Sequence, residues 1–210
     1  MAPLLPLRPH DLLEAAGPAA ILPEAPTPAW VGAVLAQAPL VVIRRHTPTA
    51  DSVPVGLRGQ RRDARWAGWL AKEAIVRRIA PEDLSRGRRW LDSPRRLPHF
   101  AVLAAIHADL DDRGLAWGPT GSAGFELASG EAHLRPDSDI DLVIRASQGL
   151  PLPLATALAT RFAAAPVRID AQVDTALGTV ALTEYIRRPP SILVRTLAGP
   201  RLIGNPWRDR

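Results

Sequence analysis

The chain has 210 residues, 47% of them hydrophobic, which is enough for one large or two small globular domains. It contains no cysteine and no run near the ~20 apolar residues of a membrane span, which excludes disulfides, thiolate chemistry and a bilayer-crossing helix. The net charge of +5 rests on arginine, favouring phosphate or acidic protein partners, although a genome rich in G and C accounts for it equally well. We expect a cytoplasmic protein that does not bind nucleic acid, because no long basic run is present.

Residues 1–92 are predicted to form a smaller α+β domain that binds the substrate or a partner. A Thr-Pro pair predicts a helix over residues 28–37, and residues 39–44 form a continuous apolar run typical of a buried strand. Valine and leucine alternate with smaller residues over 53–57, which predicts a second strand. Residues 64–79 should pack against this sheet, as either helix or strand.

An arginine cluster follows this second strand. Gly56 and Gly59 flank Arg58, and Arg61 and Arg62 follow after Gln60. Glycines that allow close backbone approach, beside guanidinium groups, suit a polyphosphate tail. An exposed hairpin with solvated arginines explains the pattern equally well. We therefore treat Arg58 and Arg61 as candidate substrate-binding residues.

The basic, proline-bounded segment 86–96 is the expected interdomain linker, and residues 93–210 the expected catalytic domain. Apolar residues at helical spacing predict a helix from residue 99 that stops at Gly114. Further elements are predicted as a strand at 115–117, a helix from residue 121, a strand at 138–144, a helix at 154–162, strands at 167–174 and 192–195, and an extended tail from 199. The pattern indicates an α+β domain with a mixed sheet and helices on one face.

Two carboxylates mark the centre of this domain. Asp139 and Asp141 are spaced i and i+2 in an apolar strand, so their side chains point the same way. Carboxylates this close repel each other unless a cation compensates, and a pair of Mg²⁺ ions is the usual solution in nucleotidyl transfer. Asp170, in the middle of the next alternating segment, is the best third carboxylate, ahead of Asp137 and Asp174.

Gly121 and Ser122 precede these carboxylates at the start of a predicted helix. A glycine lets the backbone approach a phosphate, while the serine hydroxyl and the first helical N–H groups donate to phosphate oxygens. Alternatively, Ser122 is a helix N-cap and Asp139 a turn residue. That alternative does not explain Asp141, which is followed by an apolar run where an unpaired charge is costly. The stretch therefore predicts a nucleotidyltransferase-type active site.

Several longer motifs are more specific than this general pattern. They are Arg-Pro-His-Asp-Leu-Leu at 8–13, Val-Pro-Val-Gly-Leu-Arg-Gly at 53–59, Trp-Gly-Pro-Thr-Gly-Ser at 117–122, Phe-Glu-Leu-Ala at 125–128, Ser-Asp-Ile-Asp-Leu at 138–142, Arg-Ile-Asp at 168–170 and Pro-Trp at 206–207. Through them, nearly the whole chain resembles the malonate decarboxylase holo-acyl-carrier-protein synthases, also called phosphoribosyl-dephospho-CoA transferases.

The resemblance implies a reaction. A serine of the apo acyl-carrier subunit of malonate decarboxylase would attack the α-phosphate of 2′-(5″-triphosphoribosyl)-3′-dephospho-CoA, and pyrophosphate would leave. Asp139 and Asp141 would hold Mg²⁺, and Asp170 would be a further ligand or the general base. Gly121 and Ser122 would hold the β- and γ-phosphates.

Two other functions are compatible with the same residues. The first is a nucleotidyltransferase that uses ATP or CTP on a small molecule, RNA or protein acceptor. The second is a regulatory protein that binds nucleotide without catalysis, and the presence of all three carboxylates argues against it.

Overall fold

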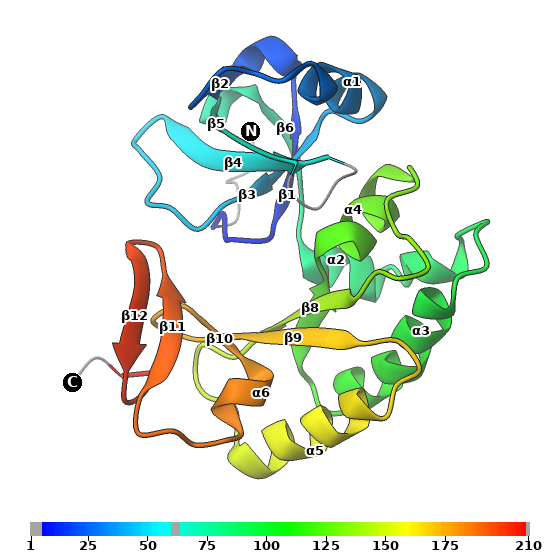
Figure 1. The fold of residues 1–210 in the computed structure, drawn as a ribbon, viewed down its shortest axis with the longest axis vertical. Coiled ribbons are helices and arrows are strands. Elements are labelled where there is room, and N and C mark those ends of the chain that lie inside the picture. The colour runs from blue at the N-terminus through cyan, green and yellow to red at the C-terminus, as the bar shows by residue number, and fades with distance from the viewer. Residues whose placement is uncertain (1–5, 60–63, 209–210) are drawn as a thin grey trace. The chain divides into compact units, whose positions relative to one another are not determined.

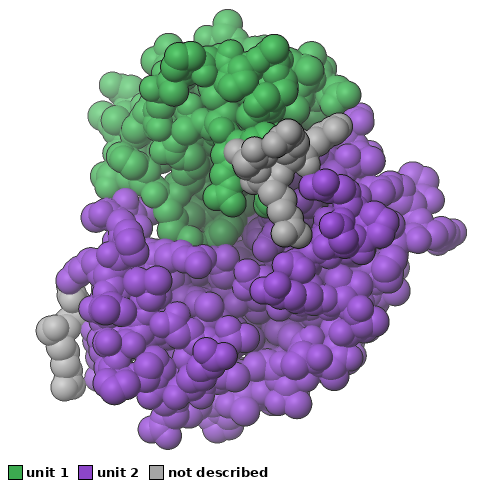
Figure 2. Space-filling view, viewed as in Figure 1, with its two compact units in different colours: residues 1–80 green, residues 81–210 purple. Residues whose placement is uncertain are grey.

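The computed structural model describes residues 6–59 and 64–208. The chain divides into two compact units, residues 1–80 and 81–210, which Figure 2 colours separately. Each unit combines helices with its own sheet, so the predicted α+β class is confirmed. No helix in the described residues is long and apolar enough to cross a membrane.

The first unit is built on an antiparallel sheet with the strand order β2-β5-β4-β3-β1-β6 (Figure 1). Its strands are β1 (Leu12–Ala15), β2 (Ile21–Pro23), β3 (Leu40–Ile43), β4 (Ser52–Arg58), β5 (Arg65–Ala71) and β6 (Ile75–Ile79), and its α-helix is α1 (Ala29–Gln37). The undecided residues 64–79 form β5 and β6. In β5 the buried residues Trp66, Gly68 and Leu70 recur with period two, the strand repeat.

The motif at residues 8–13 has a structural role in this unit. Asp11 is fully buried and accepts hydrogen bonds from the Arg78 side chain (Nε, 2.7 Å) and the Arg8 backbone N–H (3.0 Å). Because a buried carboxylate is costly unless it is paired, these two donors explain how Asp11 is tolerated beneath the sheet edge.

The second unit contains a mixed sheet with the strand order β12-β11-β10-β9-β8-β7. Its strands are β7 (Ala116–Pro119), β8 (Ile140–Arg145), β9 (Ile169–Asp174), β10 (Thr179–Ala181), β11 (Ile192–Thr196) and β12 (Gly199–Ile203). Its α-helices are α2 (Pro81–Arg86), α3 (Pro98–Asp111), α4 (Gly121–Ser129), α5 (Leu152–Ala163) and α6 (Leu182–Tyr185). Among the strand pairs of the described chain, β8 and β9 are parallel, and α5 provides the crossover that parallel strands require.

The two faces of this sheet differ in chemistry. Ile140, Leu142 and Ile144 of β8 are buried on the apolar face, along which Figure 1 shows α5 and α6. The prediction that helices cover one face only is wrong, because α2 packs against β7 on the other face. A Cβ atom on Gly118 would lie 1.9 Å from the Pro81 carbonyl oxygen, so only glycine allows this contact.

The basic segment 86–96, expected as a linker, lies within the second unit. It contains a short 3₁₀ helix, and Trp90 is buried with ring contacts to His107 and Trp117. The contacts therefore divide the chain between Ala80 and Pro81, twelve residues before the expected division at 92 and 93. The functions assigned to the two domains remain predictions.

The expected extended tail consists of the edge strand β12 and a docked end. Thr175 Oγ1 donates to the Pro206 carbonyl oxygen at 2.7 Å, and the Trp207 ring contacts Tyr185. The Pro-Trp motif thus anchors the tail to the second unit.

Candidate active site

Two of the predicted carboxylates lie side by side in the sheet. Asp141 on β8 and Asp170 on β9 are Cα partners in the parallel register, so both side chains project from the same face. Each residue is half-buried. The pattern of the sequence thus identified two neighbouring carboxylates on strands that are distant along the chain.

Asp139 is placed differently from the prediction. It lies one residue before β8, and its carboxylate Oδ2 is 3.5 Å from Nη1 of Arg168, which immediately precedes β9. The side chains are 39% and 75% exposed, so solvent weakens this pair. The structure therefore places Asp139 at the margin of the Asp141 and Asp170 pair.

The start of α4 meets the Asp141 carboxylate. The Thr120 backbone N–H donates to the Asp141 carbonyl oxygen at 2.8 Å, and a Cβ on Gly121 would lie 2.0 Å from Asp141 Oδ2. Gly121 also has φ +56°, a conformation that other residues rarely adopt. Both observations show why glycine is required beside this carboxylate.

Ser122 is in the first turn of α4, and the N-cap is Thr120, whose side chain makes no capping hydrogen bond. The alternative that Ser122 is the N-cap is therefore wrong. The first N–H groups of a helix have no acceptor within the helix and favour a negatively charged ligand. The first N–H groups of α4 consequently lie next to the Asp141 carboxylate.

A buried carboxylate that sequence reasoning missed holds the loop between α4 and Asp139. Glu126 Oε2 accepts hydrogen bonds from Arg95 Nη1 (2.6 Å) and from the backbone N–H groups of His133 (2.8 Å) and Leu134 (2.7 Å). Burial lowers the pKa of His133, while the charges of Glu126 and Glu131 act in the opposite direction. The sequence signal that could have identified Glu126 is its position, since it is an acidic residue on the buried face of a helix.

Asp174 and Asp137, which ranked lower, have other roles. Asp174 accepts hydrogen bonds from Arg145 Nη1 (3.0 Å) and Thr179 Oγ1 (2.9 Å), and Arg145 also bonds Glu82 through Nε (3.2 Å). The Arg145 side chain is only 6% exposed. Asp174 is thus part of a buried ion network, whereas Asp137 is exposed in the loop before β8.

The carboxylates provide oxygen ligands that suit a hard divalent cation. In residues 6–59 and 64–208, no three His, Cys, Asp or Glu side chains gather as a ready metal-binding group. Mg²⁺ commonly binds through one or two protein carboxylates and completes its shell with water and substrate phosphates. The neighbouring Asp141 and Asp170, with the Asp141 carboxylate packed against Gly121, fit such a partial site.

The candidate arginines belong to the first unit. Arg58 is exposed at the end of β4, and Arg61 lies outside the described residues. Their substrate-binding roles remain predictions. Trp117, which could have packed or stacked on a base, is buried and donates from Nε1 to Asp111 Oδ1 at 3.0 Å, so it packs.

Comparison with known proteins gives a consistent result. Two family profiles match, "Phosphoribosyl-dephospho-CoA transferase MdcG N-terminal domain" over residues 8–81 and the corresponding "C-terminal domain" over residues 88–206. A phosphoribosyl-dephospho-CoA transferase of Pseudomonas aeruginosa is 46% identical over 95% of this chain and 93% of its own length. A phosphoribosyl-dephospho-CoA transferase of Azotobacter vinelandii is 39% identical over 98% of this chain and 96% of its own length. No solved structure matches.

Proposed function

The chain belongs to the phosphoribosyl-dephospho-CoA transferase family, and from that premise we propose which group it transfers and to what. The donor is 2′-(5″-triphosphoribosyl)-3′-dephospho-CoA, the acceptor is a serine of the apo acyl-carrier subunit of malonate decarboxylase, and pyrophosphate is released. The observation that carries the proposal is the in-register pair Asp141 and Asp170 next to the start of α4.

The transfer exchanges a phosphoanhydride bond for a phosphoester bond. The serine oxygen of the carrier forms a bond to the α-phosphorus, and the bond from that phosphorus to the oxygen bridging to the β-phosphate breaks. Pyrophosphate leaves with the electron pair. The hydroxyl proton passes to a carboxylate, and Asp170 is our candidate because it projects from the same face as Asp141.

The residues at the start of α4 would hold the leaving group. The N–H groups of Gly121 and Ser122 and the Ser122 hydroxyl are donors for the β- and γ-phosphate oxygens. Asp139 and Asp141 would hold Mg²⁺, with Asp170 either a third ligand or the proton acceptor, and the ion would neutralise charge on the phosphate oxygens. Holding the phosphates and orienting the hydroxyl are the contributions of the protein.

The direct test is transfer measured by mass spectrometry of the carrier. Wild-type protein, apo carrier subunit, the triphosphoribosyl donor and Mg²⁺ should yield a carrier with the added mass of the prosthetic group. Asp139→Ala and Asp141→Ala should abolish this gain, while the matched control Asp137→Ala, exposed in the same loop, should retain it. An unchanged carrier together with turnover of ATP or CTP would instead favour the nucleotidyltransferase alternative.

A further inference from the structure

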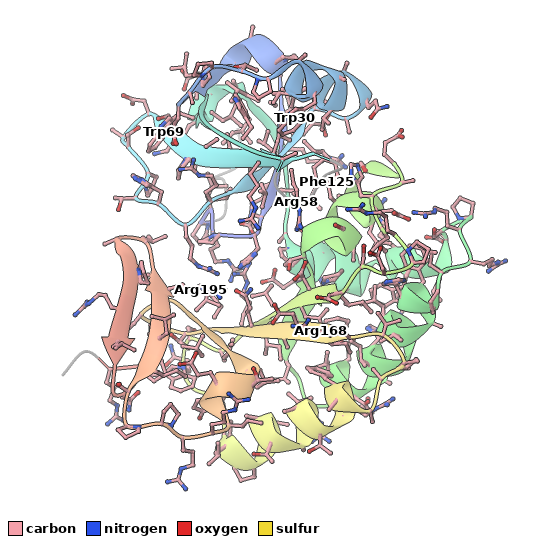
Figure 3. All side chains as sticks on the ribbon, viewed as in Figure 1. Trp30, Arg58, Trp69, Phe125, Arg168 and Arg195 are labelled. Carbon is pink, nitrogen blue, oxygen red and sulfur yellow. The ribbon has the colours of Figure 1, made fainter. Side chains whose placement is uncertain are left out.

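The sheet face that carries Asp141 and Asp170 continues beyond the carboxylates. Gln172 follows Asp170 by two residues and therefore projects from the same face of β9. Thr179 of β10 is the Cα partner of both Asp174 and Arg195, which places Arg195 of β11 on this face as well. Figure 3 labels Arg168 at the start of β9 and Arg195 on β11.

Gln172 carries a polar atom that the fold does not satisfy. Its Oε1 is buried and has no hydrogen-bond partner in the described part of the chain. The Cα partners of Gln172 are Val143 and Ala181, whose side chains have no donor to offer. Leaving a buried acceptor unpaired costs about 1–3 kcal/mol, so this half-buried side chain gains when it turns its amide toward a donor at the surface of the sheet.

Arg195 is exposed and forms no ion pair with the residues that the structure describes. By contrast, Arg145, on the same face, is buried between Glu82 and Asp174. A guanidinium group that lacks a carboxylate partner on a sheet face retains its planar donors for a phosphate group.

The positions of these residues match the shape of the proposed donor. Arg195 is on the second strand from β9, about 10 Å away across the sheet. It is level with Asp174, which is four residues, or about 13 Å, along β9 from Asp170. In the donor, the reacting triphosphate and the diphosphate of dephospho-CoA are separated by two linked ribose rings. A second anion-binding position at some distance from the carboxylates is therefore what this molecule requires.

We propose that Arg195 binds the diphosphate of the dephospho-CoA moiety and that the Gln172 side chain turns outward on binding, so that Oε1 accepts a hydrogen bond from a ribose hydroxyl between the two phosphate groups. This assignment rests on the proposed donor, and it assigns to the donor the part of the polar face from Asp170 to Arg195. Asp141 and Asp170 act at the reacting end, and Arg195 acts at the far end.

The test uses dephospho-CoA itself, which has no triphosphate and so binds without any transfer. Calorimetry on the full-length protein should show that Arg195→Ala weakens dephospho-CoA binding about tenfold, as loss of a charge-assisted hydrogen bond predicts. Arg195→Lys should retain part of the affinity that Arg195→Ala loses. Gln172→Leu should weaken dephospho-CoA binding less than Arg195→Ala does. The matched control is Arg201→Ala, because Arg201 pairs with buried Val194 and lies on the opposite face of the same hairpin.

A second ligand identifies the recognised group. Adenosine, which lacks the diphosphate, should bind wild type and Arg195→Ala equally. The proposal is overturned if Arg195→Ala binds dephospho-CoA like wild type, or if this variant only raises KM for the carrier, which would place Arg195 at a protein interface. Normal dephospho-CoA binding without transfer to the carrier would instead refute the proposed function and leave this subsite standing.

Discussion

The two ends of strands β8 and β9 both carry aspartates on the same sheet face, yet they differ in how their charges are compensated. At the carboxyl end, Asp174 is joined to buried Arg145, which also holds Glu82. At the amino end, Asp141 and Asp170 are neighbours beside the start of α4, with the Asp139 and Arg168 pair exposed at the margin. The first end is an ion network within the fold, and the second carries the carboxylates that we propose as ligand-binding residues.

The largest expected effect concerns the amino end. Asp141→Asn should lower the transfer rate by at least about a thousandfold, roughly 4 kcal/mol of transition-state stabilisation, because a carboxylate proposed to hold Mg²⁺ loses its charge. The melting temperature should change little. Carrier modification followed by mass spectrometry, with thermal unfolding in parallel, measures both. Unchanged activity would mean that the two ends do not differ in function.

At the carboxyl end the expected loss is of stability. Arg145→Met leaves Glu82 and Asp174 without their shared cation and should lower the free energy of unfolding by about 3–5 kcal/mol. Urea denaturation measures this change. Arg168→Met, at the exposed pair, is the control and should cost less than about 1 kcal/mol. Equal losses would contradict the contrast between the two ends.

A smaller effect is expected at the loop that leads to Asp139. Glu126→Gln retains the shape of the side chain but weakens its bonds to Arg95 and to the loop N–H groups, which should cost about 1–3 kcal/mol. Hydrogen exchange over residues 130–139 should accelerate more than exchange in α5. Glu131→Gln, on an exposed side chain of the same loop, serves for comparison. Uniform acceleration in both segments would argue against a local role for Glu126.

The smallest effect is a pH dependence of stability. Burial lowers the pKa of His133 in the folded protein below its ordinary value of 6.5. As the pH falls below 6.5, the unfolded chain binds the proton first, so the free energy of unfolding decreases until the folded-state pKa is passed. Urea denaturation from about pH 8 to 5 should show a shallower decrease for His133→Gln. An identical slope would show that His133 does not contribute.

The parts of the site that follow local patterns were predictable from sequence. Alternation placed Asp141 and Asp170 on strands, and the Gly-Ser pair marked the start of α4. The ion network at Arg145 was not predictable, because Glu82 and Asp174 reach it from elements far apart in the chain. Asp139 was placed inside the strand because periodicity does not show where pairing begins. The contact-based division after Ala80 was not predictable, because residues 86–96 are basic and proline-bounded although Trp90 is buried.

The parallel pairing of β8 with β9 also has a kinetic consequence. Asp141 and Asp170 become neighbours only after the whole crossover through α5 has closed, which is slower than forming a hairpin such as β11 with β12. We therefore expect the carboxylate pair to form after the local hairpin contacts during refolding. During synthesis, no ligand that needs both carboxylates can bind until β9 has left the ribosome and paired with β8.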